Sequence, residues 1–247
     1  MKQSLFTLEH ARQLTADTYE LVLSGDTSAV TAPGQFVNIQ LPGKFLRRPI
    51  SICNWTEDAL LLLVRVVGEG THDLVRCVPG TELDVLSGLG NGFDLTLGGA
   101  HPILLGGGIG IAPLYGLAQR MLEAGVTPTV GLGFRSGKDA FYLEEFSKLG
   151  CRLLVATEDG SLGTRGFVTD LAKNVPECDY AFVCGPTPML KAVHGLPQLT
   201  GGQFSFEARM GCGFGACMGC SCKTLTGYKR ICKDGPVMRK EEILWEA

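Results

Sequence analysis

Gly106-Gly107-Gly108-Ile109-Gly110-Ile111-Ala112-Pro113 is the stretch that decides the fold of the second half of the chain. It follows an apolar run at 103–105 that predicts a buried strand, and it precedes apolar residues at helical spacing over 113–124. Glycines let the backbone turn sharply and let a pyrophosphate come close, while the following helix N-terminus favours negative charge. Glycines can also serve a purely structural turn, but the flanking pattern favours a dinucleotide site at Gly106, Gly107, Gly108 and Gly110.

The alternation of strands and helices continues to about residue 200. We predict strands over 129–134, 152–156 and 180–184 and helices over 141–149 and 167–173. Alternating β and α elements imply a parallel sheet covered by helices. Residues 99–200 are therefore expected to form an α/β domain with a dinucleotide site.

Residues 1–98 show a different pattern, with short runs of strand-forming residues separated by glycine and proline. The runs lie at 19–23, 35–41, 50–54, 60–67 and 82–86. Regularly spaced short strands are typical of a small antiparallel barrel or sandwich. With a cysteine-rich tail over 201–247, the chain is predicted to be an α+β multidomain protein. Its parts are an antiparallel β-barrel, an α/β domain with a parallel sheet, and a C-terminal metal-binding region.

A second turn in the α/β domain, Cys184-Gly185-Pro186, ends the predicted strand at 180–184. Ligands of open parallel sheets bind outside the carboxyl ends of the strands, so this turn is expected to face the same crevice as the glycine stretch. Cys184 would then lie beside the nicotinamide ring. The alternative is a buried thiol at a turn stiffened by proline, which is the commoner role of a lone cysteine.

Half of the ten cysteines crowd into residues 212–232. Cys212, Cys217, Cys220 and Cys232 follow the plant-type spacing for a [2Fe-2S] cluster, in which one loop carries three thiolates and a fourth lies further on. Glycines among them let the loop wrap closely around two irons. A structural zinc site also takes four thiolates, but zinc sites usually pair cysteines in two knuckles, and this segment has one. The plant-type count does not need Cys222, which we treat as a bystander.

Composition and charge argue against several other functions. The net charge of −3 gives no positive field for a nucleic acid. The first residues show no signal peptide, and no stretch of the sequence is long and apolar enough to span a bilayer. We therefore expect a cytoplasmic protein without a nucleic-acid or membrane partner. Disulfides are unusual in that reducing compartment, which favours metal binding by the crowded cysteines.

Two segments in the first domain are candidates for binding phosphate. Arg48, Pro49, Ile50 and Ser51 lie on one predicted strand, and Arg65, Val66, Val67, Gly70 and Thr71 follow on the next. A guanidinium can grip a diphosphate through paired hydrogen bonds, and a small glycine-threonine turn can admit a second phosphate contact. Taken alone, two basic residues beside a proline are more often a solvated edge of a sheet.

In this order, the motifs resemble the ferredoxin-NAD(P) reductase superfamily across nearly the whole chain. That family combines an FAD-binding barrel, which has an Arg-x-aromatic-Ser strand, with a nicotinamide domain that has GGGxGxxP and CGP turns. Arg48 and Ser51 match the strand motif, whereas Ile50 replaces the aromatic residue. The resemblance implies that Arg48 contacts the pyrophosphate of FAD and that Ser51 contacts the flavin ring.

The tail narrows the resemblance to the electron-transfer subunits of B-type, NAD-dependent dihydroorotate dehydrogenases. The matching segments are 46–51, 106–113, 207–213 and 232–237. Reductases fused to a complete ferredoxin have a longer gap before the fourth cysteine. The resemblance implies a flavoprotein subunit of pyrimidine biosynthesis that contains FAD and [2Fe-2S] and uses NAD. Its expected partner is an FMN-containing catalytic subunit that oxidises dihydroorotate to orotate, in a heterotetramer of two copies of each chain.

The chemistry of the carriers sets their order. A nicotinamide exchanges a hydride, an iron-sulfur cluster exchanges single electrons, and a flavin does both, so FAD must lie between the other two. The histidines do not form an acid-base group for dihydroorotate; they are His10, His72, His101 and His194, scattered along the chain. They are expected to be surface or packing residues, and the catalytic base is expected on the partner.

Two other functions stay open from the sequence. One is a related reductase subunit that serves a hydrogenase or a ferredoxin, and the other is a zinc-containing binding protein without redox activity. The residues also leave NAD and NADP open. Arg135, Ser136 and Lys138 could bind a 2′-phosphate, whereas Glu158 and Asp159 would repel it. The resemblance favours NAD.

Overall fold

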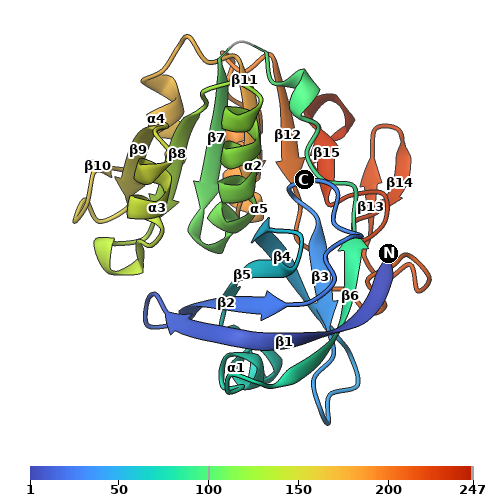
Figure 1. The fold of residues 1–247 in the computed structure, drawn as a ribbon. Helices are drawn as coiled ribbons and strands as arrows, with labels where there is room; N and C mark the ends of the chain where they lie inside the picture. The colour runs from blue at the N-terminus through green and yellow to red at the C-terminus, as the bar shows by residue number, and fades with distance from the viewer. Residues whose placement is uncertain (100, 246–247) are drawn as a thin grey trace.

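The structure, a computed structural model, describes residues 1–99 and 101–245. It contains a closed barrel, a seven-stranded sheet covered by helices, and a small hairpin near the C-terminus (Figure 1). The strands are β1 (Lys2–Gln13), β2 (Thr18–Ser24), β3 (Phe36–Ile39), β4 (Arg48–Trp55), β5 (Ala59–Arg65), β6 (Glu82–Leu89), β7 (Pro102–Gly107), β8 (Thr129–Phe134), β9 (Arg152–Thr157), β10 (Thr164–Arg165), β11 (Tyr180–Cys184), β12 (Gly201–Ser205), β13 (Ser221–Thr224), β14 (Gly227–Arg230) and β15 (Val237–Arg239). The α-helices are α1 (Glu69–Val75), α2 (Ala112–Glu123), α3 (Leu143–Lys148), α4 (Val168–Lys173) and α5 (Thr187–His194). Short 3-10 turns are η1 (Leu95–Leu97), η2 (Gly108–Ile111), η3 (Gly137–Asp139) and η4 (Lys240–Glu242).

The first part of the chain forms the predicted antiparallel barrel. Its strands are arranged in the closed order β1-β2-β5-β4-β3-β6. Apolar side chains that alternate along the strands fill the interior, among them Phe6, Leu21, Val37, Ile52 and Leu62. The opposite face of β3 points out of the barrel, and Phe36 packs there against the C-terminal segment.

Two elements of the barrel domain, β1 and α1, were not predicted from the sequence. β1 closes the barrel by pairing with β2 and β6. Most of its residues are exposed or half-buried, so the alternation that marks a strand is weak in the sequence. α1 follows directly on Gly68 and buries Leu74 and Val75 in the barrel core.

The α/β domain contains the predicted parallel sheet, in the order β10-β9-β8-β7-β11-β12-β15. β8 and β11 have the predicted bounds, and β9 is one residue longer. Residues of α2 pack into one hydrophobic cluster and residues of α4 and α5 into another. α5 was not predicted, because Pro186 and Pro188 give its start the look of an irregular turn.

The sheet extends past residue 200, where we expected the second domain to end. β12 pairs with β11 in parallel, and β15 pairs with β12 in antiparallel orientation. β12 begins with Gly201 and Gly202, so the sequence has no apolar run to mark it. The C-terminal segment therefore begins as the continuation of the sheet and returns to it after the cysteines.

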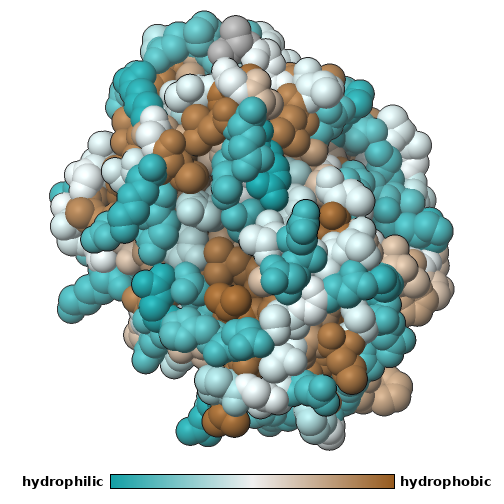
Figure 2. Space-filling view, viewed as in Figure 1, coloured by the Kyte–Doolittle hydropathy of each residue, from teal (hydrophilic) through white to brown (hydrophobic). Residues whose placement is uncertain are grey.

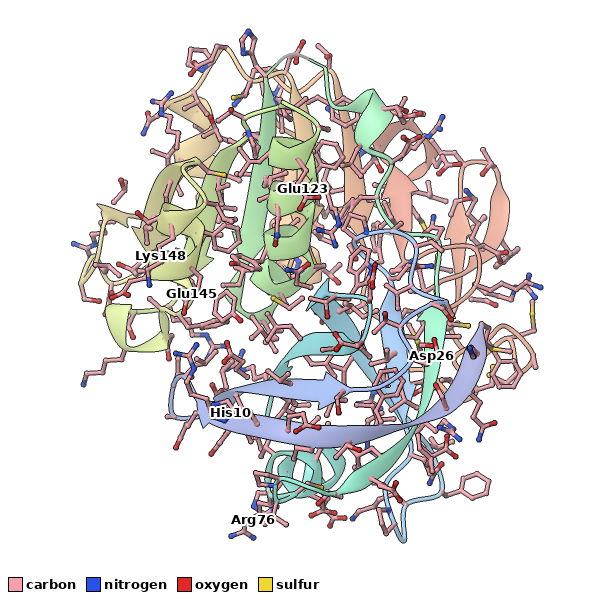
Figure 3. The ribbon with its side chains drawn as sticks, viewed as in Figure 1. His10, Asp26, Arg76, Glu123, Glu145 and Lys148 are labelled. Atoms are coloured by element: carbon pink, nitrogen blue, oxygen red, sulfur yellow. The ribbon has the colours of Figure 1, made fainter. Side chains whose placement is uncertain are left out.

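The barrel and the α/β domain are held together by apolar packing of α2 against barrel residues such as Cys53 and Leu63, and by polar contacts. The Tyr142 hydroxyl donates to Glu20 Oε2 at 2.6 Å, and Arg12 Nη2 lies 3.3 Å from Glu145 Oε1. Figure 3 shows Glu145 on the part of α3 that faces the barrel. On this face of the molecule, hydrophobic residues form separate patches within a largely hydrophilic surface (Figure 2). In residues 1–99 and 101–245, no helix has the length and apolar character needed to cross a membrane.

Candidate functional site

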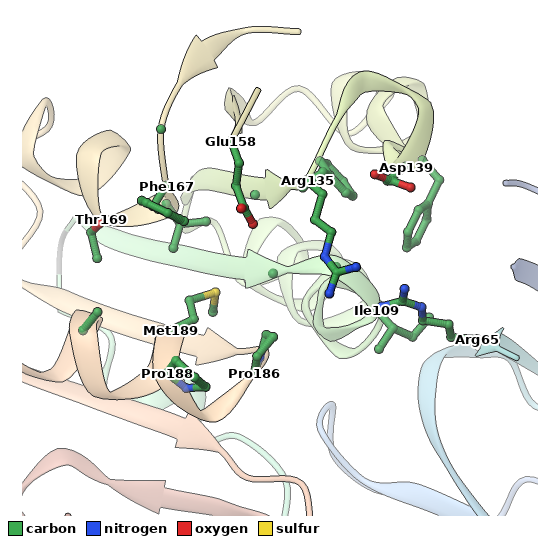
Figure 4. Close-up of a pocket in the computed structure, with 18 of the residues that line it drawn as sticks. Arg65, Ile109, Arg135, Asp139, Glu158, Phe167, Thr169, Pro186, Pro188 and Met189 are labelled. Carbon is green, nitrogen blue, oxygen red and sulfur yellow. The ribbon is translucent and has the colours of Figure 1, made fainter. Parts of the chain in front are cut away.

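A pocket of about 410 Å³ opens between the barrel and the carboxyl ends of the parallel strands (Figure 4). The barrel contributes Asp17, Thr18 and Arg65 to its lining. The glycine stretch contributes Gly107 and Gly108, and the turn after β11 contributes Pro186. The pocket is thus located where open α/β sheets bind their ligands.

The glycine stretch and the turn after β11 lie in direct contact. A Cβ atom on Gly110 would be 2.4 Å from the backbone oxygen of Cys184, and one on Gly107 would be 2.4 Å from Met189 Sδ. No real Cβ tolerates such distances from backbone, so glycine at 110 is a requirement of packing. The structure therefore brings Gly106, Gly107, Gly108, Gly110, Gly185 and Pro186 together at one edge of the sheet.

The side chain of Cys184 is buried beneath this edge. Burial raises the pKa of its thiol to about 12, and the nearby Glu207 carboxylate adds to the shift. Burial also raises the pKa of Glu207. Pro186 lines the pocket, whereas Cys184 is buried and is not among the lining residues.

The loops after β8 and β9 form another part of the pocket lining. Arg135 and Glu158 both line it (Figure 4), while Ser136 and Asp159 hydrogen-bond within their own loops to Asp139 and Ser161. Other lining residues were not predicted from the sequence, among them Phe134, Asp139, Phe141, Phe167, Thr169 and Met189. They come from separate strands, helices and loops, and no local motif marks them.

The predicted FAD segment splits into two places. Arg48 Nε would be 1.8 Å from a Cβ on Gly70, so the guanidinium lies directly over this glycine at the first turn of α1. Thr71 fixes that turn by accepting from the Val67 amide at 2.9 Å. Arg65 instead bonds Asp17 at 2.7 Å and lines the pocket at the carboxyl ends of the parallel strands. The Arg48 and Gly70 cradle has the cation and the backbone donors that suit a diphosphate.

Along β4, side chains alternate between the barrel interior and the outer face. Ile50 packs in the barrel core, and Ser51 is half-buried and lies opposite Phe36 of β3. Pro49 lies opposite Asn38. Val66 is also placed by the barrel, since its amide donates to Asp17 O at 2.7 Å.

The four predicted cluster cysteines lie in one segment as two pairs. The amides of Ala216 and Cys217 approach Cys212 Sγ at 3.3 and 3.4 Å, and the amide of Cys232 approaches Cys220 Sγ at 3.4 Å. Burial acts against ionisation of Cys212, but the hydrogen bonds from these amides lower its pKa to about 6. Burial and the neighbouring Cys220 raise the pKa of Cys232 to about 12.

This donor set fits a [2Fe-2S] cluster. Each iron of such a cluster takes two cysteine thiolates, and backbone N–H groups that point at sulfur stabilise the ligands. In the described part of the chain, no three histidine, cysteine, aspartate or glutamate side chains converge on a single-ion position. Cys217 is exposed and Cys232 is buried, so the pairs reach from the surface to the interior of the segment.

The histidines lie as expected, at the surface or in packing positions. His10 is exposed on β1 (Figure 3), and His72 and His101 are also exposed. His194 packs against Trp245, with ring centroids 5.5 Å apart. None of the four lines the pocket.

Comparison with known proteins gives two family matches and many relatives. Residues 104–195 match the oxidoreductase NAD-binding domain, and residues 207–244 match the iron-sulfur cluster binding domain of dihydroorotate dehydrogenase B. The electron transfer subunit of dihydroorotate dehydrogenase B (NAD(+)) from Listeria monocytogenes is 41% identical over 98% of this chain and 99% of its own length. The chain belongs to this family of electron-transfer subunits. The corresponding subunit from a Geobacillus species is also 41% identical, over 99% of both chains. As an oxidoreductase subunit of this kind, the chain acts with a catalytic partner subunit.

Solved structures agree with this assignment. A chain of the NADH-dependent reduced ferredoxin-NADP oxidoreductase superposes with a TM-score of 0.89 at 30% identity, covering 98% of this chain and 90% of that one. A cytochrome P450 reductase from Amycolatopsis superposes with a TM-score of 0.69 at 24% identity, covering 78% of this chain and 65% of that one, and shows the shared fold.

Proposed function

We propose that this subunit carries electrons between NAD and the FMN of a dihydroorotate dehydrogenase catalytic subunit, through FAD and a [2Fe-2S] cluster. NAD binds in the pocket between the barrel and the sheet. FAD binds along β4, with its pyrophosphate at Arg48 and Gly70. Cys212, Cys217, Cys220 and Cys232 hold the cluster. The paired arrangement of these four thiolates is the observation that carries the proposal.

The residues of this chain bind and position the carriers and perform no acid-base chemistry of their own. A bound flavin supplies the conversion between a hydride from the nicotinamide and single electrons for the cluster. Gly107, Gly108 and Pro186 let the dinucleotide approach the sheet edge, and Arg65 supplies a cation at the barrel side of the pocket. Oxidation of dihydroorotate requires a base that the partner subunit supplies.

The partner docks over the cluster segment, in a heterotetramer with two copies of each chain. Cys217 is exposed there, and so are the neighbouring Phe214 and Met218. Exposed apolar side chains beside an electron carrier suit a permanent interface, because they become buried when the carriers come close. We place the protein in the cytoplasm, in pyrimidine biosynthesis, because a reducing compartment keeps cysteine thiols available to ligate a metal cluster.

Anaerobic titration of the isolated chain with NADH tests the proposal. The protein should show flavin absorption bands with a broad red shoulder from the cluster, and both signals should bleach on reduction. A reduced [2Fe-2S] cluster should then appear by electron paramagnetic resonance. A colourless protein that contains zinc would contradict the proposal.

A second candidate is a subunit that serves a ferredoxin-linked reductase. The solved structure that superposes with a TM-score of 0.89 is a chain of a ferredoxin-NADP oxidoreductase, and this similarity supports the second candidate. The partner decides between the two. Co-purification with an FMN-containing subunit that oxidises dihydroorotate supports the first, and co-purification with a ferredoxin reductase subunit supports the second.

A further inference from the structure

Asn38 is the point at which the barrel holds the first cluster cysteine. Its amide Nδ2 donates to the backbone oxygen of Cys212 at 3.2 Å. The next residue, Gly213, packs so closely on the same amide that a Cβ there would lie 2.3 Å from Nδ2. Gly213 also has φ +79, a conformation that favours glycine, so the loop turns at the contact.

Asn38 is fixed from the barrel side as well. It is 1% exposed, and on β3 it lies opposite Pro49 of the strand that carries Arg48 and Ser51. Arg47 Nη1 donates to the backbone oxygen of Asn38 at 3.3 Å. The two terminal guanidinium nitrogens of Arg47 also donate to the carboxylate of Asp84. The Asn38 side chain is therefore held by a strand whose position is itself locked.

The hydrogen bond from Asn38 to Cys212 connects the proposed FAD site with the proposed cluster site. On one side lies β4, where FAD is proposed to bind, and on the other lies Cys212, a proposed ligand of the cluster. Asn38 Oδ1 is buried and accepts no hydrogen bond from the described part of the chain, so the side chain is committed to Cys212 through its nitrogen alone. A buried polar atom without a partner needs an explanation, and a requirement for the position of the amide nitrogen supplies one.

We propose that Asn38 is a positioning residue for electron transfer between FAD and the cluster. Its hydrogen bond sets the separation between β4 and Cys212, and so the distance that electrons cross. The inference rests on the proposed function, because it requires both carriers on this chain. Asn38 itself exchanges no electron or proton.

Two variants isolate the contact. Asn38→Asp keeps the shape and replaces the donor with an oxygen that repels the Cys212 carbonyl, whereas Asn38→Leu removes polarity without adding charge. Asn91→Leu is the matched control. Asn91 also joins the barrel to the C-terminal segment, with Nδ2 donating to Val237 O at 2.8 Å, but it contacts no cluster cysteine.

Rapid mixing of the holoprotein with NADH, followed by freeze-quench electron paramagnetic resonance, measures the two steps separately. FAD should be reduced at the wild-type rate in all variants. Cluster reduction should slow several-fold in both Asn38 variants, because electron transfer becomes slower as the separation between the two carriers grows. The spectrum of the reduced cluster should shift in the same variants. Asn91→Leu should lower thermal stability and leave the rate and the spectrum unchanged.

Wild-type rates and spectra in both Asn38 variants would overturn the inference, and so would equal slowing in Asn91→Leu. If Asn38→Leu cannot be purified with its cluster, Asn38→Ser replaces it, with the same expected slowing. Failure of the proposed function has a different signature, because the wild-type protein would then lack FAD or the cluster.

Discussion

The backbone oxygen of Cys184 lies 2.4 Å from the point that a Cβ atom on Gly110 would occupy. This contact locks the glycine stretch after β7 onto the turn after β11. The two turns line the pocket proposed to bind NAD, so their spacing sets the shape of that part of the pocket.

Gly110→Ala should therefore weaken NADH binding. Overpacking of this kind costs about 1–3 kcal/mol, and the loss in affinity should be about tenfold or more. Titration of the protein with NADH measures it. Gly195→Ala is the control, because the nearest atom to a Cβ there is 3.6 Å away. Wild-type affinity in Gly110→Ala would show that the two turns separate without consequence.

Arg48→Ala should release FAD and leave the cluster in place. Loss of a charge-assisted hydrogen bond costs about 1.5–3 kcal/mol, so the FAD dissociation constant should rise at least roughly tenfold. Arg47→Ala provides the comparison, since Arg47 pairs with Asp84 and should mainly affect thermal stability. Unchanged FAD affinity in Arg48→Ala would refute the assigned pyrophosphate contact.

Serine at Cys212, Cys217, Cys220 or Cys232 should remove or badly weaken the [2Fe-2S] signal. Hard oxygen is a poor substitute for a soft thiolate ligand of iron. Serine at Cys222 should leave the signal intact. Iron and sulfide analysis with electron paramagnetic resonance measures the outcome. If Cys222→Ser lost the cluster while Cys220→Ser kept it, the ligand assignment would be wrong.

Glu158→Gln should improve the use of NADPH relative to NADH. Glu158 and Arg135 line the same end of the pocket, and removal of the carboxylate leaves the guanidinium to attract a 2′-phosphate. The ratio of kcat/KM values for the two nucleotides with an artificial acceptor measures the effect, which should be several-fold. Asp159→Asn is the control, since Asp159 hydrogen-bonds Ser161 in its own loop. An unchanged ratio in Glu158→Gln would place the nucleotide ribose elsewhere.

Local patterns in the sequence were sufficient for the elements next to the site. β8, α2 and β11 are apolar segments bounded by glycine or proline, and each was predicted close to its observed bounds. β1 and β12 were not predicted, because one is mostly exposed and the other begins with two glycines. Pairing with neighbouring strands stabilises β1 and β12, and the local sequence of a strand does not specify its neighbours.

The residues of the site also divide into those that local sequence motifs predict and those that only the tertiary structure brings together. Motifs found the glycine stretch, the turn after β11 and the cysteine spacing, since each needs particular residues at fixed separations. Phe167 and Thr169 were not predicted as site residues, because they line the pocket only through the packing of α4 against the sheet. The grouping of Arg65 with Asp17, away from Arg48, depends on the pairing of β2 with β5, which places Arg65 opposite Thr18.

The most direct test of the central claim is dihydroorotate-dependent reduction of NAD by the subunit reconstituted with its FMN-containing partner. The isolated subunit should reduce an artificial one-electron acceptor with NADH and should not oxidise dihydroorotate. Adding the partner should create the coupled activity. The gain should vanish in the Cys217→Ser variant, although NADH still reduces its FAD. Dihydroorotate oxidation by this chain alone, or undiminished coupled activity without the cluster, would contradict the account.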